Sequence, residues 1–272
     1  MLKKRLIPSL LVRNGRIVQS VNFRHTNVIG NAFTAVDFFN AWAVDEIIIL
    51  DISPDRSFKK PFEDIVRGLS RRCFVPLTVG GWIQTVEDIR TALLCGADKV
   101  CINTQAWQRP EFITEAAATF GSQCLVVSID VRGATPETHQ VYVAHAQTPT
   151  GRHPAAWARD MQDRGAGEIY LTSVDHDGCR GGYDLPLVRS VTSAVDLPVI
   201  AFGGVGHWSH MVEGITVGKA EAVAAANIFH YTEHSTKKAK EYLIRAGIDV
   251  RQTYFYKVNR PRNVSYETDY RV

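Results

Sequence analysis

The stretch Val79-Gly80-Gly81 decides the fold, because it recurs as Phe202-Gly203-Gly204 in the second half of the chain, 123 residues later. A second pair, Gly96-Ala97-Asp98 and Gly218-Lys219-Ala220, lies 122 residues apart. Matched offsets of this kind are typical of a duplicated half-domain, although glycine also recurs by chance where strands meet loops. The repeat predicts a chain made of two similar halves.

Eight short apolar runs are separated by segments long enough for a helix. They are residues 6–12, 46–52, 75–79, 99–103, 125–130, 168–173, 198–202 and 222–226. Consecutive apolar residues are expected in strands covered on both faces, as in parallel α/β sheets. A doubly wound open sheet also alternates strand and helix, but the repeat favours a single (β/α)8 TIM barrel built from two half-barrels over residues 1–251.

Two of the intervening segments show clear helical signals. Residues 86–94 have helical spacing and are followed by Gly96, and residues 154–164 are followed by Gly165, where glycine favours a helix end. Residues 252–272 lie outside the pattern. We expect this C-terminal tail either to be partly ordered on the barrel or to dock a partner through its tyrosines and Phe255.

Composition points to one soluble globular domain. The 272 residues are 45% hydrophobic and 22% charged, with a net charge of +3 that is too small to predict nucleic-acid binding. No apolar run is long enough for a membrane span, and no signal peptide is expected. Five cysteines without a C-x-x-C pair favour reduced thiols in the cytoplasm, and no metal or other cofactor is predicted.

Both Gly-Gly pairs are expected at the carboxyl ends of strands, where barrel proteins carry their chemistry. Without a Cβ, each pair lets a phosphate oxygen approach the main chain closely. Glycine is also common in such junctions for the turn alone. Two pairs at symmetric positions predict a small-molecule ligand with two phosphates.

Three further stretches carry a family resemblance. They are Phe120-Gly121-Ser122-Gln123, Gly165-Ala166-Gly167-Glu168-Ile169 and Thr172-Ser173-Val174-Asp175-His176-Asp177-Gly178. Over about residues 1–251 the chain resembles HisF, the cyclase subunit of imidazole glycerol phosphate synthase. The resemblance implies acid–base catalysis by paired aspartates on strands one and five. Here Asp130 is present on strand five, but Leu11 replaces its partner and can neither accept nor donate a proton.

The resemblance also implies two phosphate sites, with Thr172 and Asp175 orienting the substrate between them. The phosphate-binding residues it implies are Gly81, Asn103, Thr104, Asp177, Gly178, Gly204, Ala226 and Asn227. Alternatively, Asp175 and Asp177 cap the next helix and stabilise the loop of residues 178–182. Trp82, Gln19 and Asn227 depart from the family, where glycine, lysine and serine are usual, and the indole of Trp82 is expected to crowd the first phosphate site.

The opposite end of the barrel carries four charges at strand starts, namely Arg5, Glu46, Lys99 and Glu168. Charges near a barrel axis need partners, so we expect a ring of alternating sign. The ring is either a stabilising plug or, as the resemblance implies, the gate of an ammonia passage. The resemblance also places Asp98 at the interface with a HisH-like glutaminase subunit.

These residues predict a HisF-like synthase subunit of a glutamine amidotransferase that docks a glutaminase and conducts ammonia, with its own cyclase chemistry impaired. The resemblance implies amidation of an N-acetyl sugar for lipopolysaccharide or other surface polysaccharide, with a sugar amidotransferase as a further partner. Two alternatives stay open. One is a genuine cyclase, a lyase of histidine biosynthesis, using Asp130 and a replacement group. The other is a scaffold that activates the glutaminase without conducting ammonia.

Overall fold

The computed structural model describes residues 3–41, 44–231 and 235–252. Eight parallel strands form a closed barrel, because β10 pairs with β11 on one side and with β7 on the other. In order around the barrel they are β1 (Arg5–Arg13), β4 (Ile47–Asp51), β5 (Leu77–Gly80), β6 (Lys99–Ile102), β7 (Leu125–Arg132), β10 (Glu168–Ser173), β11 (Val199–Phe202) and β12 (Ala222–Ala225). The predicted TIM barrel is confirmed, and the open sheet is excluded.

The barrel strands separate two apolar cores. Outward-facing side chains such as Leu6, Ile49 and Val127 pack under the helices. Inward-facing side chains fill the lumen, and this inner core comprises Ile7, Ile48, Leu50, Cys101, Val126, Tyr170, Ile200, Phe202, Ala222, Ala224 and Ala226. Because successive residues of a strand face opposite ways, burial on both faces explains the unbroken apolar runs of the sequence.

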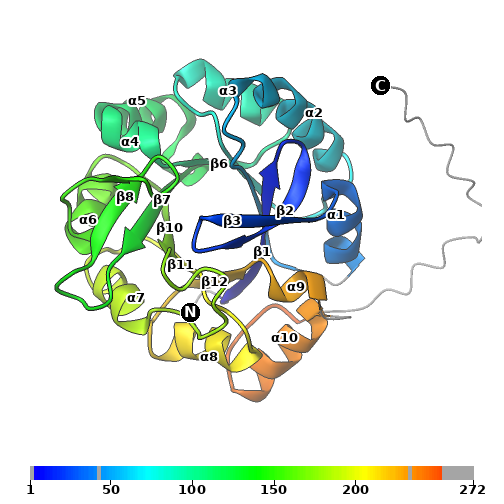
Figure 1. Cartoon of the computed structure of the whole chain (residues 1–272), viewed down its shortest axis with the longest axis vertical. Coiled ribbons are helices and arrows are strands. Elements are labelled where there is room, and N and C mark those ends of the chain that lie inside the picture. Colours follow the sequence, from blue (N-terminus) through cyan, green and yellow to red (C-terminus); the bar gives the residue numbers. More distant parts are fainter. Residues whose placement is uncertain (1–2, 42–43, 232–234, 253–272) are drawn as a thin grey trace, which may run out of the picture.

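Helices surround the barrel (Figure 1). The longer ones are α1 (Ala32–Ala41), α2 (Lys59–Ser70), α3 (Val86–Leu94), α5 (Glu111–Phe120), α6 (Pro154–Asp163), α7 (Leu185–Thr192), α8 (Trp208–Thr216) and α10 (Ser235–Arg245). Short helical segments are η1 (Arg56–Phe58), α4 (Thr104–Gln108), η2 (Ser122–Cys124) and α9 (Ile228–Tyr231). The two predicted helices correspond to α3 and α6, and a reciprocal capping box between Thr85 and Asp88 starts α3.

Two antiparallel additions were not predicted. After β1 the chain turns at Asn14 and Gly15, both with positive φ, into the hairpin of β2 (Arg16–Val21) and β3 (His25–Gly30). After β7 it forms β8 (Gln140–Val143) and β9 (Thr148–Pro149). The β2–β3 hairpin crosses the centre of the barrel in Figure 1 and covers its mouth. It is called the mouth hairpin below.

The last residues of the barrel domain contact the segments before β1 and β4. Lys4 forms a parallel bridge with Val250, and Arg251 donates to Asp45 and to the carbonyl of Val44. Beyond this point the predicted docking tail, apart from Gln252, lies outside the described residues, so its two interpretations stay predictions.

Candidate functional site

Polar side chains gather at the mouth, where the barrel strands have their carboxyl ends. Asp130 and Thr172 are neighbours in the register of β7 and β10, and Asn103 follows β6. The mouth hairpin contributes Ser20. All but Asn103 are buried, so the mouth is a covered polar site.

Asp130 is the central carboxyl of this site. It accepts hydrogen bonds from Asn103 Nδ2 at 3.1 Å and from Ser128 Oγ at 3.2 Å, but no cation pairs with it among the described residues. Burial raises the pKa of Asp130 to about 7, and these donors only partly oppose the effect. A carboxyl whose pKa lies near neutrality can both take and give a proton. Asp130 therefore has the protonation behaviour expected of a general acid or base.

Leu11 lies across the mouth from Asp130. Strand β1 is four strands from β7 in the closed order of eight, so the two strands are diametrically opposite. Leu11 is buried and is paired in register with Val18 of the mouth hairpin and Leu50 of β4. The Leu11 side chain is thus apolar and cannot exchange a proton with a substrate at the mouth.

Asp177 is a second carboxyl with an unusual environment. Its Oδ2 accepts a hydrogen bond from Ser20 Oγ at 2.7 Å, and burial raises its pKa to about 6 although Ser20 opposes the shift. Its charge also helps to raise the pKa of Asp130, so the two carboxyls influence each other. Sequence reasoning placed Asp177 at a phosphate site, but its raised pKa makes it an acid–base candidate as well.

The residues expected at the first phosphate site have protein partners. Asn103 donates to Asp130 and to the carbonyl of Ser128, and the Thr104 hydroxyl accepts the backbone N–H of Ala144. Gly81 has a φ of 109° and lies against Asp51, where a Cβ would approach the carbonyl oxygen to 2.7 Å. Its glycine is therefore required by packing alone, whether or not a phosphate binds there.

The expected second phosphate site lies under the mouth hairpin. Gly204 and Gly182 join through a backbone hydrogen bond of 2.8 Å, and Gly178 packs against Ser20 so closely that a Cβ would clash. Asn227 Nδ2 donates to the carbonyl of Ser20, whereas its buried Oδ1 has no partner among the described residues. Ala226, also assigned to this site, belongs to the inner core. Rotation of the Asn227 amide would present N–H donors here.

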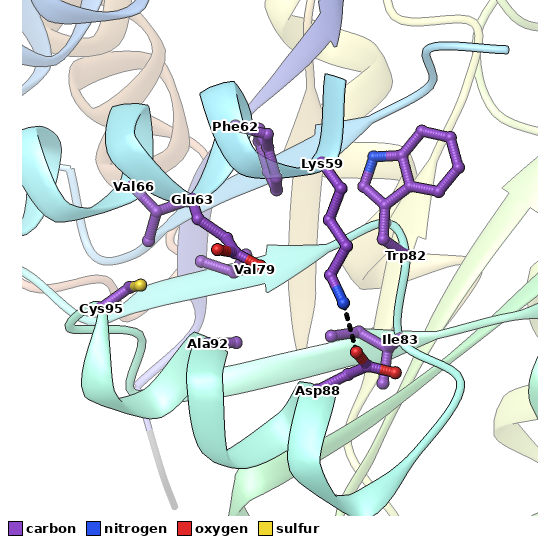
Figure 2. A pocket seen from close by; sticks show the side chains of 11 residues that line it. Lys59, Phe62, Glu63, Val66, Val79, Trp82, Ile83, Asp88, Ala92 and Cys95 are labelled. Carbon is purple, nitrogen blue, oxygen red and sulfur yellow. Dashed lines mark hydrogen bonds and ion pairs between the residues drawn. The ribbon is translucent and has the colours of Figure 1, made fainter. Parts of the chain in front are cut away.

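Trp82 does not crowd the mouth as expected. Its indole packs against the outer core, and Figure 2 shows it beside Lys59 and Ile83 around a crevice between α2 and α3. Its Nε1 donates to Asp51 Oδ2 at 3.0 Å. The crevice, which is also crossed by a Lys59–Asp88 ion pair, has room for little more than one water molecule. Trp82 thus adopts a positive φ of 63°, rare for a bulky residue, to point outward.

The two residues expected to orient substrate have different surroundings. Thr172 is buried beside Asp130, and its hydroxyl helps to lower the pKa of that carboxyl. Asp175 instead accepts hydrogen bonds from Arg132 Nη1 at 2.8 Å and from the backbone N–H of Gly133. The alternative assignment of Asp175 and Asp177 as helix caps is wrong, because Asp184 caps α7 through Leu187 N.

The predicted ring of charges closes the opposite end of the lumen. Arg5 Nη1 contacts Glu46 at 2.8 Å and Arg5 also pairs with Glu168, while Lys99 lies 3.0 Å from Glu46 and 2.9 Å from Glu168. Burial alone would lower the pKa of Arg5, but the adjoining carboxylates, Glu168 foremost, raise it above its ordinary value. Each charge has two opposite neighbours, as the sequence predicted. These four residues are called the ionic ring below.

A groove lies beside the ionic ring on the same end of the barrel. Asp98, Phe74, Cys73 and Pro76 line it, and Asp98 is anchored by the backbone N–H of Leu77 at 2.8 Å. Phe74 is 86% exposed and Leu94 is 78% exposed. A solvent-exposed aromatic side chain that lines a groove together with a carboxylate is typical of a docking surface for another protein.

A histidine could in principle replace the missing base, and three histidines lie on the segments that follow β1, β7 and β10. His25 is exposed on the mouth hairpin, His145 is exposed beyond β8, and His176 Nδ1 contacts the carbonyl oxygen of Gly182 at 2.8 Å. Within the described residues no three metal-binding side chains cluster, and no helix has both the length and the apolarity to cross a membrane. None of the three histidines is placed beside Asp130 by a hydrogen bond.

Taken together, the closed barrel and the polar residues at its strand ends define a (β/α)8-barrel protein with a covered candidate acid–base site. The family model described as histidine biosynthesis protein matches residues 5–235. The chain therefore belongs to this family, and the match supports a HisF-like barrel.

Proposed function

We propose that this chain is the HisF-like synthase subunit of a glutamine amidotransferase. It docks a HisH-like glutaminase on the end that carries the ionic ring and receives ammonia there. Its own ring-forming chemistry is impaired, and the ammonia is used to amidate an N-acetyl sugar in the biosynthesis of lipopolysaccharide or another surface polysaccharide. The glutaminase contacts include Asp98, and a sugar amidotransferase consumes the ammonia in the cytoplasm.

The contrast between Leu11 and the ionic ring carries this proposal. Closing an imidazole ring with loss of a leaving group needs one group to take a proton and another to give one. The mouth has Asp130 on one wall and an apolar Leu11 on the opposite wall. At the other end all four charges of the ring are present and paired. This contrast supports a barrel that keeps the family's delivery end and has an incomplete catalytic pair.

An assay with purified protein tests the proposal. The ribulosyl substrate of the family's cyclases and an ammonium salt bypass the glutaminase, so turnover reports the mouth alone. We expect turnover lower than that of a complete cyclase by roughly 10²- to 10⁴-fold, the usual contribution of one acid–base group. The Leu11→Asp variant should recover part of the lost turnover. The Leu11→Asn variant should not, because asparagine is similar in size to aspartate but cannot ionise. Normal turnover by the unmodified chain would overturn the proposal.

One observation favours a second candidate, a genuine cyclase. Asp177 and Asp130 are both buried, have raised pKa values and influence each other, so Asp177 offers a second carboxyl in place of Leu11. In that case the unmodified chain would turn over the ribulosyl substrate, and Asp177→Asn would abolish turnover as fully as Asp130→Asn. Under our proposal the unmodified chain already has only the weak turnover predicted above, and Asp177→Asn should not lower it as far as Asp130→Asn does.

A further inference from the structure

Two aromatic rings occupy the lumen between the ionic ring and the mouth. Tyr170 on β10 and Phe202 on the adjacent strand β11 stack with centroids 5.2 Å apart and an interplanar angle of 28°. Both are buried and belong to the inner core. Tyr170 lies two residues beyond Glu168 of the ionic ring and two before Thr172 of the mouth, on the same face of the strand.

The tyrosine spans the lumen. Its hydroxyl donates to Ser9 Oγ at 3.1 Å, and Ser9 lies on β1, three strands away from β10 in the closed order. Burial raises the pKa of the Tyr170 hydroxyl, so it remains protonated and able to donate. A side chain that is anchored at both walls cannot leave the axis without breaking this hydrogen bond.

Small residues make the room that the two rings fill. Strand β12 presents Ala222 and Ala224 to the lumen, Ala226 directly after it also belongs to the inner core, and Gly80 on β5 has no side chain at all. Leucine and isoleucine side chains take up most of the remaining space, with Leu50 only 2.5 Å from where a Cβ of Gly80 would lie. Large residues set against small ones produce a packed core rather than an open pore.

The stack also has a direct connection to the mouth. Phe202 is followed by Gly203 and Gly204, both with φ near 100°, and Gly204 is bonded to Gly182 through the backbone. These glycines belong to the turn expected to hold the second phosphate. A ligand that rearranges this turn must therefore move the backbone next to Phe202.

We propose that Tyr170 and Phe202 form an inner gate of the lumen, closed in the free protein and opened when phosphate binds at the Gly203–Gly204 turn. This inference rests on the proposed function, since it gives ammonia that has passed the ionic ring a second barrier before the mouth. The gate would hold ammonia back until the acceptor site is occupied.

Reaction of Cys101 with methylmercury tests the gate. Cys101 is an inward-facing residue of the inner core, Cys95 is buried in the outer core, and Cys179 is exposed. Labelling of each cysteine is followed by peptide mass spectrometry. We expect Cys101 in the unmodified chain to react roughly 100-fold more slowly than Cys179, as buried sites opened only by local fluctuation do.

Variants separate opening of the lumen from unfolding. Tyr170→Ala should increase the reaction rate of Cys101 by roughly tenfold or more while Cys95 stays protected, because only the lumen opens. Tyr170→Phe keeps the ring and loses the hydrogen bond to Ser9, and should increase the rate by less than about threefold. Reaction of Cys95 in the Tyr170→Ala variant would indicate wider unfolding. In that case Phe202→Leu, which removes less volume, is used in place of Tyr170→Ala.

Inorganic phosphate supplies the opening test. Millimolar phosphate should speed labelling of Cys101 in the unmodified chain and leave Cys95 unchanged. Cys101 as reactive as Cys179 without phosphate would show an open lumen, and no response to phosphate would show a static plug; either result overturns the gate. Labelling needs neither glutaminase nor acceptor, so it tests the gate alone. The proposed function is tested separately, and normal cyclase turnover would overturn it.

Discussion

The two ends of the lumen bury charged groups in opposite ways. At the ionic ring Glu46 and Glu168 each face both Arg5 and Lys99, so every charge is compensated. At the mouth Asp130 has only neutral donors and a pKa raised to about 7. Compensation makes the ring a fixed structural element, whereas the lack of it leaves the mouth ready to change protonation state or to bind a ligand.

The largest expected effect comes from breaking the ring. Lys99→Met removes one cation and leaves Glu46 and Glu168 buried with Arg5 alone. Loss of one partner from a buried ion pair typically costs about 3–5 kcal/mol of unfolding free energy, and we expect the lower end because Lys99 is partly exposed. Urea denaturation measures the change. The control Lys60→Met, which removes an exposed i,i+4 pair with Asp64, should cost less than about 1 kcal/mol. Equal losses of unfolding free energy in the two variants would contradict the special stability of the ionic ring.

The next effect concerns the pH dependence of the mouth. The folded pKa of Asp130, about 7, exceeds its unfolded value of about 3.9, so ionisation destabilises the folded state. Its favourable contribution is fully present below pH 4 and is lost as the pH rises through 7. Asp130→Asn should therefore become more stable relative to the unmodified chain by at most about 4 kcal/mol across this window. Thermal unfolding from pH 4 to 8 measures the difference. A difference that does not change with pH would place the pKa of Asp130 in its ordinary range.

A smaller effect is expected where the mouth hairpin meets the barrel. Ser20→Ala removes the 2.7 Å hydrogen bond to Asp177 and should destabilise the protein by about 1–2 kcal/mol at pH 7. It should also raise the pKa of Asp177 further, because the hydroxyl now lowers it. Hydrogen exchange of the hairpin amides should accelerate. Ser190→Ala is the control, since that hydroxyl bonds only within α7, and it should leave hairpin exchange unchanged.

The smallest effect on stability is expected at the groove beside the ring. Phe74→Ser in the groove and Leu94→Gln at the end of α3 alter exposed side chains and should change the unfolding free energy by less than about 0.5 kcal/mol. Under the proposed function they should nevertheless weaken binding of the glutaminase by roughly tenfold, as loss of an apolar anchor does. Titration calorimetry with the purified partner measures this. Unaltered affinity in both variants would move the docking surface away from this groove.

Much of the fold could be predicted because burial on both strand faces leaves an unmistakable pattern. The eight barrel strands produced consecutive apolar runs, and the helical spacing of residues 86–94 followed by Gly96 marked α3. The mouth hairpin was missed since its second strand is largely exposed, although the Asn14-Gly15 turn is a known hairpin signal.

The site could be predicted only in part. The ionic ring followed from unlike charges at strand starts, where an unpaired charge would be costly. The direction of Trp82 could not be predicted, because it depends on a rare positive φ and on a hydrogen bond to Asp51. The stack of Tyr170 on Phe202 was equally hidden, since either aromatic residue fits an apolar strand and only barrel closure brings both to the axis.

The mouth hairpin has a consequence for the rate at which the site can work. The hairpin does not begin with a flexible linker, because β1 continues into β2 through a tight turn. The last three residues of β1 are paired with the first three of β2, from Leu11 with Val18 to Arg13 with Arg16. Movement of this hairpin away from the mouth therefore requires part of a β-ladder to unzip rather than a loop to swing. Lid and local-opening motions take microseconds to seconds, so the pairing of Leu11 with Val18 is expected to affect the rate at which a ligand enters the mouth.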